Sequence, residues 1–357
     1  MIDISIGYLP LTDAATLIAA ADFGFAEREG LRLNLQREVS WATLRDRLAV
    51  GHLDAAHMLA PLAVATSLGL GQLRRELKAV FVLNANGNAL TVSPALAREI
   101  AAAAAGALDS AQASAQALGI LVAARRASAL RPLTFASTFP FSSHTTLLRT
   151  FLAQGGIDPD RDIEIVVVPP PFMVDCMDKG LIDGFCVGSP WNSLAVDRGK
   201  GVILALGTEI VPEAVEKVLA LPADAGLLRN GAGERLLRAL DAAASFVEDP
   251  GHRQAVAQAL GARFDVAAEV MSRTLSGELV IDAAGRRRLA PGFIRFACAG
   301  LNRPDPATGR ALHAEMVQAG QAPSDVRAAQ LAADVFDPAL YDASLLAGQK
   351  PDHRDVH

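Results

Sequence analysis

Short apolar runs alternate with longer helical patterns along most of the chain. Residues 2–7 alternate apolar and polar positions, as a strand does. Residues 78–83 and 163–168 are almost continuously apolar, which indicates strands that are covered on both faces, as in a parallel sheet. The pattern therefore predicts an α/β fold.

Gly, Pro and N-capping residues divide the pattern into elements. Ser40 is a good N-cap for the helix that follows it, and Gly30 and Gly155 follow predicted helices. Residues 84–88 are predicted to form a turn. The predicted strands are 2–7, 31–35, 54–59, 78–83, 133–136, 163–168, 182–187 and 202–206, and the predicted helices are 13–29, 41–50, one from Pro61, 145–154, 171–180 and 190–198.

Two longer regions lack this alternation. Residues 95–131 are rich in alanine and predict surface helices, and the carboxyl third from about Gly226 is almost wholly helical in pattern. The tail after Gly348 has the composition of a disordered segment.

The chain is too long for one ordinary core, since it has 357 residues and 51% hydrophobic content. We expect a two-lobed fold with a hinged cleft. Residues 1–88 and 203–357 are assigned to lobe 1 with a helical carboxyl-terminal extension, and residues 89–202 to lobe 2.

Charge and hydropathy exclude several classes of protein. The net charge is −6 and no long basic run occurs, so direct binding of nucleic acid is not expected. The mean hydropathy of +0.27 comes largely from alanine, and charged residues or glycine interrupt each apolar stretch before it could span a membrane.

The amino terminus has no signal-peptide pattern, because a strand pattern starts at residue 2. If Met1 is the natural start, this predicts a cytoplasmic protein, whereas a periplasmic protein with its leader removed would begin in the same way. Three cysteines, an odd number, favour a reducing compartment.

Motifs for several enzyme classes are absent from the sequence. There is no Gly-x-Gly-x-x-Gly after the first strand, no phosphate-loop lysine motif and no Gly-x-Ser-x-Gly elbow. His52 and His57 are five residues apart and fall on different faces of a helix or of a strand, which argues against a shared metal. No enzyme activity, cofactor or metal is expected.

Three strand-to-helix turns bear the most informative residues, at 139–145, 168–171 and 185–191. His144 lies at a predicted helix start, where free backbone N–H groups and the helix dipole favour an anion. Gly188 lacks a Cβ and lets a ligand approach the backbone. Both also have an ordinary interpretation, as a helix-capping histidine and a turn glycine.

Three further side chains have two open interpretations. Trp41 could donate its indole N–H to a ligand or fill the core. Lys217 precedes an apolar run, so its ammonium points into a cleft or pairs at the surface with Glu213 or Glu216. Asn88 offers an amide to a ligand or closes a turn.

A set of motifs, in this order, resembles the nitrate- and bicarbonate-binding proteins of ABC importers over roughly residues 2 to 225. The segment around Gly188 is the most specific. The motifs are Gly7-Tyr8-Leu9-Pro10, Ser40-Trp41-Ala42, Asn86-Gly87-Asn88, Phe139-Pro140 with His144, Gly155 to Asp160, Val167 to Pro171, Phe185 to Asn192 and Glu216 to Leu219. The resemblance implies a periplasmic-binding-protein fold of type II that closes on a small planar oxoanion without turnover.

The resemblance also implies which residues bind the anion. The family's nitrate pocket falls on Trp41, Asn88, His144, Pro170, Val187, Gly188 and Lys217. Nitrate accepts hydrogen bonds and donates none, so we expect a pocket of donors only. Bicarbonate has a proton to donate and is expected to need a carboxylate where Lys217 stands.

Within this resemblance the chain is most similar to the cytoplasmic nitrate and nitrite sensors of the NasS type. The implied function is a sensor that controls an RNA-binding antiterminator partner through ligand-induced lobe closure. The alternative is a periplasmic nitrate- or bicarbonate-binding protein of an ABC importer. The implied ligands are nitrate or nitrite, and no membrane insertion is expected.

Overall fold

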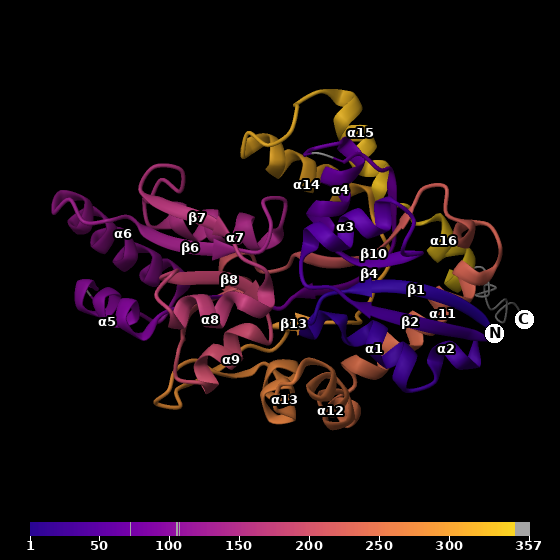
Figure 1. Cartoon of the computed structure of the whole chain (residues 1–357), viewed down its shortest axis with the longest axis horizontal. Helices are drawn as coiled ribbons and strands as arrows, with labels where there is room; N and C mark the ends of the chain where they lie inside the picture. The colour runs from indigo at the N-terminus through magenta and orange to yellow at the C-terminus, as the bar shows by residue number, and fades with distance from the viewer. Residues whose placement is uncertain (72, 105, 107, 347–357) are drawn as a thin grey trace, which may run out of the picture.

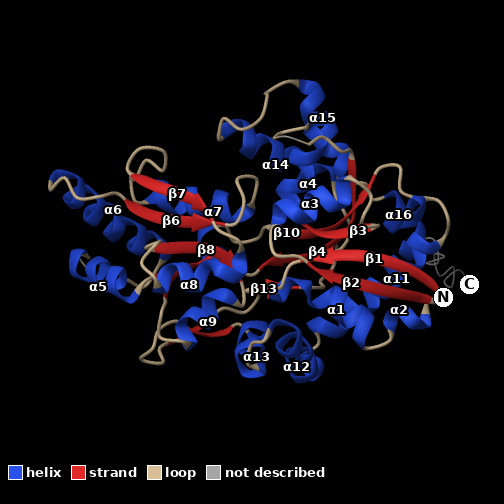
Figure 2. Cartoon of the chain, in the orientation of Figure 1, coloured by secondary structure: helices blue, strands red, loops and turns tan. Residues whose placement is uncertain are grey.

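Two β-sheets, each flanked by helices, form the framework in a computed structural model that describes residues 1–71, 73–104, 106 and 108–346 (Figures 1 and 2). The first sheet has six strands in the order β13-β4-β10-β3-β1-β2. Their bounds are β1 Ile2–Tyr8, β2 Leu31–Arg37, β3 Ala55–Leu59, β4 Leu77–Asn86, β10 Val215–Pro222 and β13 Ile294–Arg295.

The second sheet has five strands in the order β7-β6-β8-β5-β9. Strands β7, β6 and β8 run parallel, and β5 is antiparallel to both of its neighbours. The bounds are β5 Asn88–Val92, β6 Leu133–Ser137, β7 Ile163–Val167, β8 Gly184–Gly188 and β9 Val202–Leu206. The predicted α/β fold with parallel strands covered by helices is confirmed.

Helices cover both sheets. Around the first sheet lie η1 Thr12–Ala14, α1 Ala15–Asp22, α2 Phe25–Arg28, α3 Trp41–Ala49, α4 Ala60–Leu68, α11 Ala232–Glu248 and α12 Arg253–Phe264. Around the second lie α5 Pro94–Ala103, α6 Ala111–Ala127, α7 Ser143–Gln154, η2 Pro170–Phe172, α8 Met173–Asp178, α9 Trp191–Asp197 and α10 Gly207–Ile210. In Figure 1, α3 and α4 lie above the first sheet, and α1 and α2 lie below it.

The carboxyl third returns to both sheets. Helix α13 Ala268–Ser276 packs on α9, and the hairpin of β11 Glu278–Val280 and β12 Arg287–Leu289 follows it. Helix α14 Pro306–Gln318 packs with α15 Val326–Val335 against α4. The remaining elements are η3 Gly226–Leu228, η4 Pro250–His252, α16 Ala339–Tyr341 and η5 Asp342–Leu346.

The chain passes from the first sheet to the second through a single residue, Gly87, between β4 and β5. Its φ of 98° is one that a residue with a side chain rarely adopts, and an added Cβ would lie 3.0 Å from Ile294 Cδ1. The chain returns to the first sheet between β9 and β10. The assignment of lobes to residue ranges stays a prediction, but β9 belongs to the second sheet, so the return begins after Leu206 rather than at residue 203.

Several local predictions are wrong. The helix expected over 13–29 is divided into η1, α1 and α2, and the break between α1 and α2 falls at Gly24, which adopts a left-handed φ of 76°. Residues 84–86 continue β4 instead of forming a turn, and the carboxyl third contains β11, β12 and β13. The tail after Gly348, predicted to be disordered, lies outside the described residues.

In the described ranges, none of the helices has the length and apolar character that crossing a bilayer requires.

Candidate functional site

The turns singled out from the sequence meet where the two sheets face each other. Strands β6, β7 and β8 are parallel, so their carboxyl ends share one edge of the second sheet. His144 and Pro170 lie in the segments after β6 and β7, and Gly188 is the last residue of β8. In the first sheet, the parallel strands β1 and β2 lead into η1 and α3, which carry Asp13 and Trp41. Ligand sites of α/β sheets form outside such carboxyl ends.

A bulge in β10 brings two consecutive side chains, Glu216 and Lys217, to this place. Val215 pairs with Ala85 and Lys217 with Asn84, so Glu216 is an extra residue in the ladder. Alternation in a regular strand would send the two side chains to opposite faces. Instead both are fully buried, and Lys217 Nζ donates to Glu216 Oε1 at 2.6 Å.

Asp13 completes a buried ionic network around Lys217. Its Oδ2 lies 2.7 Å from Lys217 Nζ, and its Oδ1 lies 2.9 Å from Nε2 of His57 on β3. Burial acts to raise the pKa of Asp13, but the charges of Lys217 and His57 outweigh it and lower that pKa to about 2. The aspartate is therefore ionised at neutral pH.

The other two charges of the network are fixed by the same balance. Burial opposes the charge on Lys217, yet Asp13 and Glu216 raise its pKa above the usual value. Burial also opposes the charge on Glu216, yet Lys217 and His144 lower its pKa. The network is thus a Lys217 ammonium held between the carboxylates of Asp13 and Glu216.

His144 approaches the network from the second lobe. It is fully buried in the first turn of α7, whose N-cap Ser142 accepts a hydrogen bond from Thr145 N at 3.1 Å. Its Nδ1 lies 2.9 Å from Thr138 Oγ1, and its Nε2 lies 3.5 Å from Glu216 Oε1. Burial is the main cause that lowers the pKa of His144 to about 4, so the imidazole is neutral at pH 7.

Trp41 borders the same ammonium from the first lobe. Its ring centroid lies 5.5 Å from Lys217 Nζ and 6.0 Å from the His57 ring, and the side chain is fully buried. Within the described residues, neither Trp41 Nε1 nor His144 Nε2 has a hydrogen-bond partner. Buried donors without partners are rare, and two of them beside one ammonium indicate a place for an acceptor.

Asn88 and Gly188 form one wall. They are paired across β5 and β8, and Asn88 Nδ2 donates to Glu216 Oε2 at 2.7 Å. A Cβ on Gly188 would lie 3.4 Å from both Asn88 Oδ1 and Asp13 Oδ2. Leu11 Cδ2 is at the same distance, so a side chain at this position would pack directly against these three atoms.

The remaining two predicted residues are buried nearby on the same lobe. Val187 lies in β8 next to Gly188, and its carbonyl oxygen accepts a hydrogen bond from Asn192 Nδ2 at 2.8 Å. Pro170 is buried at the start of η2, without a recorded polar contact to the ionic network. The contacts thus join Trp41, Asn88, His144, Gly188 and Lys217. Val187 precedes Gly188 in the chain, and no recorded contact joins Pro170 to the cluster.

Two features of the cluster differ from the expectation. A pocket of donors only is wrong, because the Asp13 and Glu216 carboxylates lie in it. The sequence interpretation also missed Asp13 and His57. Asp13 fell inside a predicted helix, and His57 was considered only with His52. A polar residue after the first strand and a histidine within an apolar strand were the available signals.

The two lobes are in contact around the cluster. Trp191 Nε1 donates to Pro10 O at 3.1 Å, and Thr12 N donates to Ser189 O at 2.7 Å. After α14, Gln321 Nε2 donates to Pro140 O at 3.2 Å, in the loop that leads to His144. The structure is therefore a closed arrangement of the lobes.

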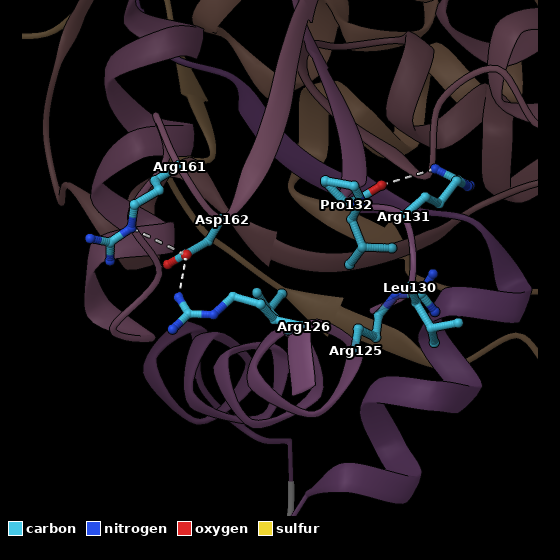
Figure 3. A pocket seen from close by; sticks show the side chains of 9 residues that line it. Arg125, Arg126, Leu130, Arg131, Pro132, Arg161 and Asp162 are labelled. Carbon is cyan, nitrogen blue, oxygen red and sulfur yellow. Dashed lines mark hydrogen bonds and ion pairs between the residues drawn. The ribbon is translucent and has the colours of Figure 1, made fainter. Parts of the chain in front are cut away.

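A second group of cations lies on the surface of the second lobe, where Arg125, Arg126, Arg131 and Arg161 line a small cavity (Figure 3). Each guanidinium is paired with a carboxylate, for example Arg126 with Asp162 at 2.8 Å. Exposed pairs of this kind are weak and already matched in charge. The buried cluster is the better candidate for an anion site.

Sequence comparison relates the chain to anion transport proteins. It is 34% identical over 257 residues to the nitrate import ATP-binding protein NrtC of Synechocystis, with 71% of this chain and 36% of that protein covered. It is 30% identical over 286 residues to the nitrate/nitrite binding protein NrtA of Synechococcus elongatus, covering 77% and 62%. The bicarbonate-binding protein CmpA of Synechococcus elongatus is 29% identical, covering 79% and 62%. The chain thus spans less than two thirds of these relatives.

Solved structures share the fold. The periplasmic nitrate-binding protein NrtA from Synechocystis PCC 6803 superposes with a TM-score of 0.88 at 23% identity, over 98% of this chain and 89% of that one. The desulfurization enzyme DSZB is a more distant match, with a TM-score of 0.57 at 12% identity, over 97% and 99%. The expected two-lobed periplasmic-binding-protein fold is confirmed. Since the family profile matches residues 2–261, the chain belongs to the NMT1-like family and is related to its nitrate- and bicarbonate-binding members.

Proposed function

We propose that this protein binds nitrate or nitrite between its lobes, without chemical turnover, at a site formed by Trp41, Asn88, His144, Pro170, Val187, Gly188 and Lys217. The observation that carries the proposal is the pair of buried donors without partners, Trp41 Nε1 and His144 Nε2. The Trp41 ring centroid lies 5.5 Å from the Lys217 ammonium, and His144 Nε2 lies 3.5 Å from the neighbouring Glu216 Oε1. An ammonium has three donors, of which Asp13 and Glu216 take two. A planar oxoanion matches the donors that remain.

Bicarbonate is the second candidate, favoured by one observation. The Glu216 carboxylate lies in the cluster and could accept the proton that bicarbonate donates. Both Glu216 oxygens, however, already accept hydrogen bonds, Oε1 from Lys217 and Oε2 from Asn88. We therefore favour an anion that offers no proton.

Calorimetric titration with nitrate, nitrite, bicarbonate and sulfate tests the proposal. Trp41→Phe is the sharpest variant, because it removes a donor that has no protein partner and keeps an aromatic side chain, although a smaller one. We expect nitrate affinity to fall at least ~10-fold, since a hydrogen bond to a charged group is worth about 1.5–3 kcal/mol. The smaller ring also leaves a cavity, so stability should fall as well. For comparison, Trp191→Phe removes an indole N–H that donates to Pro10 O of the other lobe, so it should lower stability and weaken nitrate binding only through lobe closure, by roughly two- to tenfold.

His144→Ala and Lys217→Ala should each weaken nitrate binding at least ~10-fold for the same reason. Lys200→Ala is the control for the lysine, because Lys200 is half exposed and pairs with Asp178 at the surface. Unchanged nitrate affinity in Trp41→Phe, His144→Ala and Lys217→Ala would refute the site.

We further propose that anion binding closes the lobes, and that this closure controls the binding of a cytoplasmic antiterminator partner. The resemblance to the NasS-type sensors implies this role. Support comes from the closed arrangement, in which segments of both lobes form contacts that an open form would lose. The alternative is delivery of the anion to an ABC importer. Size-exclusion chromatography with a purified antiterminator decides between them: a complex that nitrate dissociates supports the sensor, and the lack of any complex supports the importer.

A further inference from the structure

Five titratable side chains meet at the centre of the candidate site: Asp13, His57, His144, Glu216 and Lys217. All five are buried, four of them completely, and Asp13 is 3% exposed. Two carboxylates stand against a single ammonium. These three charged side chains carry one net negative charge before any anion enters, and the neutral imidazole of His144 adds none.

A monovalent anion would add a second negative charge to this buried volume. Burying a charge without compensation is strongly unfavourable, and the Lys217 ammonium is already matched by two carboxylates. Nitrate brings no proton of its own. A positive charge must therefore arrive with it, and an imidazole inside the site is the group that can accept one.

We propose that the site binds its anion together with one proton, and that His144 takes up this proton and becomes an imidazolium. The inference rests on the proposed function and adds the proton as a second ligand. In the complex, an imidazolium N–H of His144 faces both the anion and Glu216, so the added charges cancel.

The geometry favours His144 over His57. The Nδ1 atom of His144 is occupied by Thr138 Oγ1 at 2.9 Å, whereas Nε2 is 3.5 Å from Glu216 Oε1 and has no hydrogen-bond partner in the described chain. Neither ring nitrogen of His57 makes a recorded hydrogen bond in the described chain, but its Nε2 already lies 2.9 Å from the Asp13 Oδ1 carboxylate oxygen.

The charged groups that face His144 come from two elements of the other lobe. Glu216 and Lys217 project from β10, and Asp13 projects from η1. Burial and Lys217 disfavour the imidazolium, while Glu216 and Asp13 favour it. An anion beside Nε2 favours the imidazolium in the same way as Glu216 and Asp13 do.

The direction of the pH effect follows from linkage. Without ligand, burial keeps the pKa of His144 at about 4, and an adjacent anion raises it. Between these two pKa values the complex holds more protons than the free protein. Nitrate affinity therefore falls by up to about tenfold for each unit of pH increase in that range, and levels off below about pH 4.

A pH electrode in weakly buffered solution measures the proton directly. Saturating potassium nitrate is added to the whole protein at pH 6, with potassium chloride as the control salt. We expect uptake of about one proton per bound nitrate, from the charge balance described above. Nitrate binding with no proton uptake, and with the same affinity at pH 5.5 and pH 8, would overturn the proposal and leave the proposed function intact.

Two variants assign the proton. His144→Gln should still bind nitrate, more weakly, with no proton uptake, and His57→Gln should keep the uptake. The reverse pattern would overturn the assignment to His144. Failure of the unmodified protein to bind nitrate at any pH would instead refute the function on which the inference rests.

Discussion

Lys217 illustrates how a buried charge can be kept in a folded protein. Its ammonium is fully buried between Asp13 and Glu216, at 2.7 and 2.6 Å. Removing one partner of such a pair costs about 3–5 kcal/mol, because it leaves an uncompensated buried charge. A polar cluster that is costly to build and rigid once built is suited to recognising one kind of ligand rather than to stabilising the fold.

His144 predicts how the stability of the ligand-free protein depends on pH. Its folded pKa of about 4 lies below the usual 6.5, so between pH 6.5 and pH 4 the unfolded state binds more protons. Stability is therefore complete above pH 6.5 and falls as the pH is lowered, by about 3 kcal/mol at pH 4. Urea unfolding at several pH values measures the effect.

The matched control for this prediction is His144→Gln, which cannot titrate. Its free energy of unfolding should change less between pH 6.5 and pH 4 than that of the unmodified protein. Parallel curves for the two proteins would show that His144 is not the group responsible. Asp13 does not confuse the comparison, because its pKa of about 2 puts its loss of stabilisation below that range.

At the scale of elements, the sequence predicted the regular parts of the fold. The alternation of apolar runs and caps placed β1, α3 and β9 within a residue or two of their observed bounds, because hydrophobic period and capping are local properties. It also singled out Trp41, His144 and Lys217 before any contact was known. The break at Gly24 was missed, since a helical pattern continues on both sides of it.

The parts that could not be predicted depend on pairing between distant segments. The bulge in β10 exists only in its register with β4, so sequence alternation could not show that Glu216 and Lys217 reach the same site. Asp13 becomes informative only when Lys217 and His57 lie beside it, across more than 40 residues of chain. Local patterns carry no information on such neighbours.

The N-cap of α7 links an element to the site. Ser142→Ala removes the hydrogen bond that Ser142 Oγ accepts from Thr145 N and should cost about 1 kcal/mol of stability. It should also weaken nitrate binding several-fold, because His144 lies in the first turn of that helix. Denaturant unfolding and calorimetric titration measure the two effects.

Ser110→Ala supplies the comparison. Ser110 caps α6 through the same bond, accepted from Ala113 N at 3.1 Å, and α6 bears none of the site residues. A similar loss of stability with unchanged nitrate affinity is expected. Equal affinity losses in the two variants would mean that the effect of Ser142 is not transmitted through His144.

For the whole molecule, the contacts between lobes decide how firmly it stays closed. The carboxyl-terminal helices take part, since Gln321 after α14 reaches the loop before His144. Helix α13 packs on α9, where Arg273 pairs with Asp197 at 3.2 Å. The helical third of the chain therefore adds contacts to the second lobe beyond those of the two crossing segments.

Gln321→Ala tests this contribution. The lost hydrogen bond is worth about 0.5–1.5 kcal/mol, so nitrate affinity should fall roughly two- to tenfold. The dissociation rate should carry most of the change, because the contact exists only in the closed form. Gln318→Ala, an exposed glutamine in the last turn of α14, is the control and should bind as the unmodified protein does. Identical dissociation rates for the two variants would show that the hydrogen bond from Gln321 to Pro140 does not stabilise the closed form.

The chain has only two tryptophans, and both lie where the lobes meet. Trp41 faces the ammonium of Lys217 and the ring of His57, while Trp191 donates to a backbone oxygen of the other lobe. Indole emission is sensitive to nearby charge and to solvent. The protein thus contains its own fluorescent reporters, and opening of the cleft should change the emission spectrum without any attached dye.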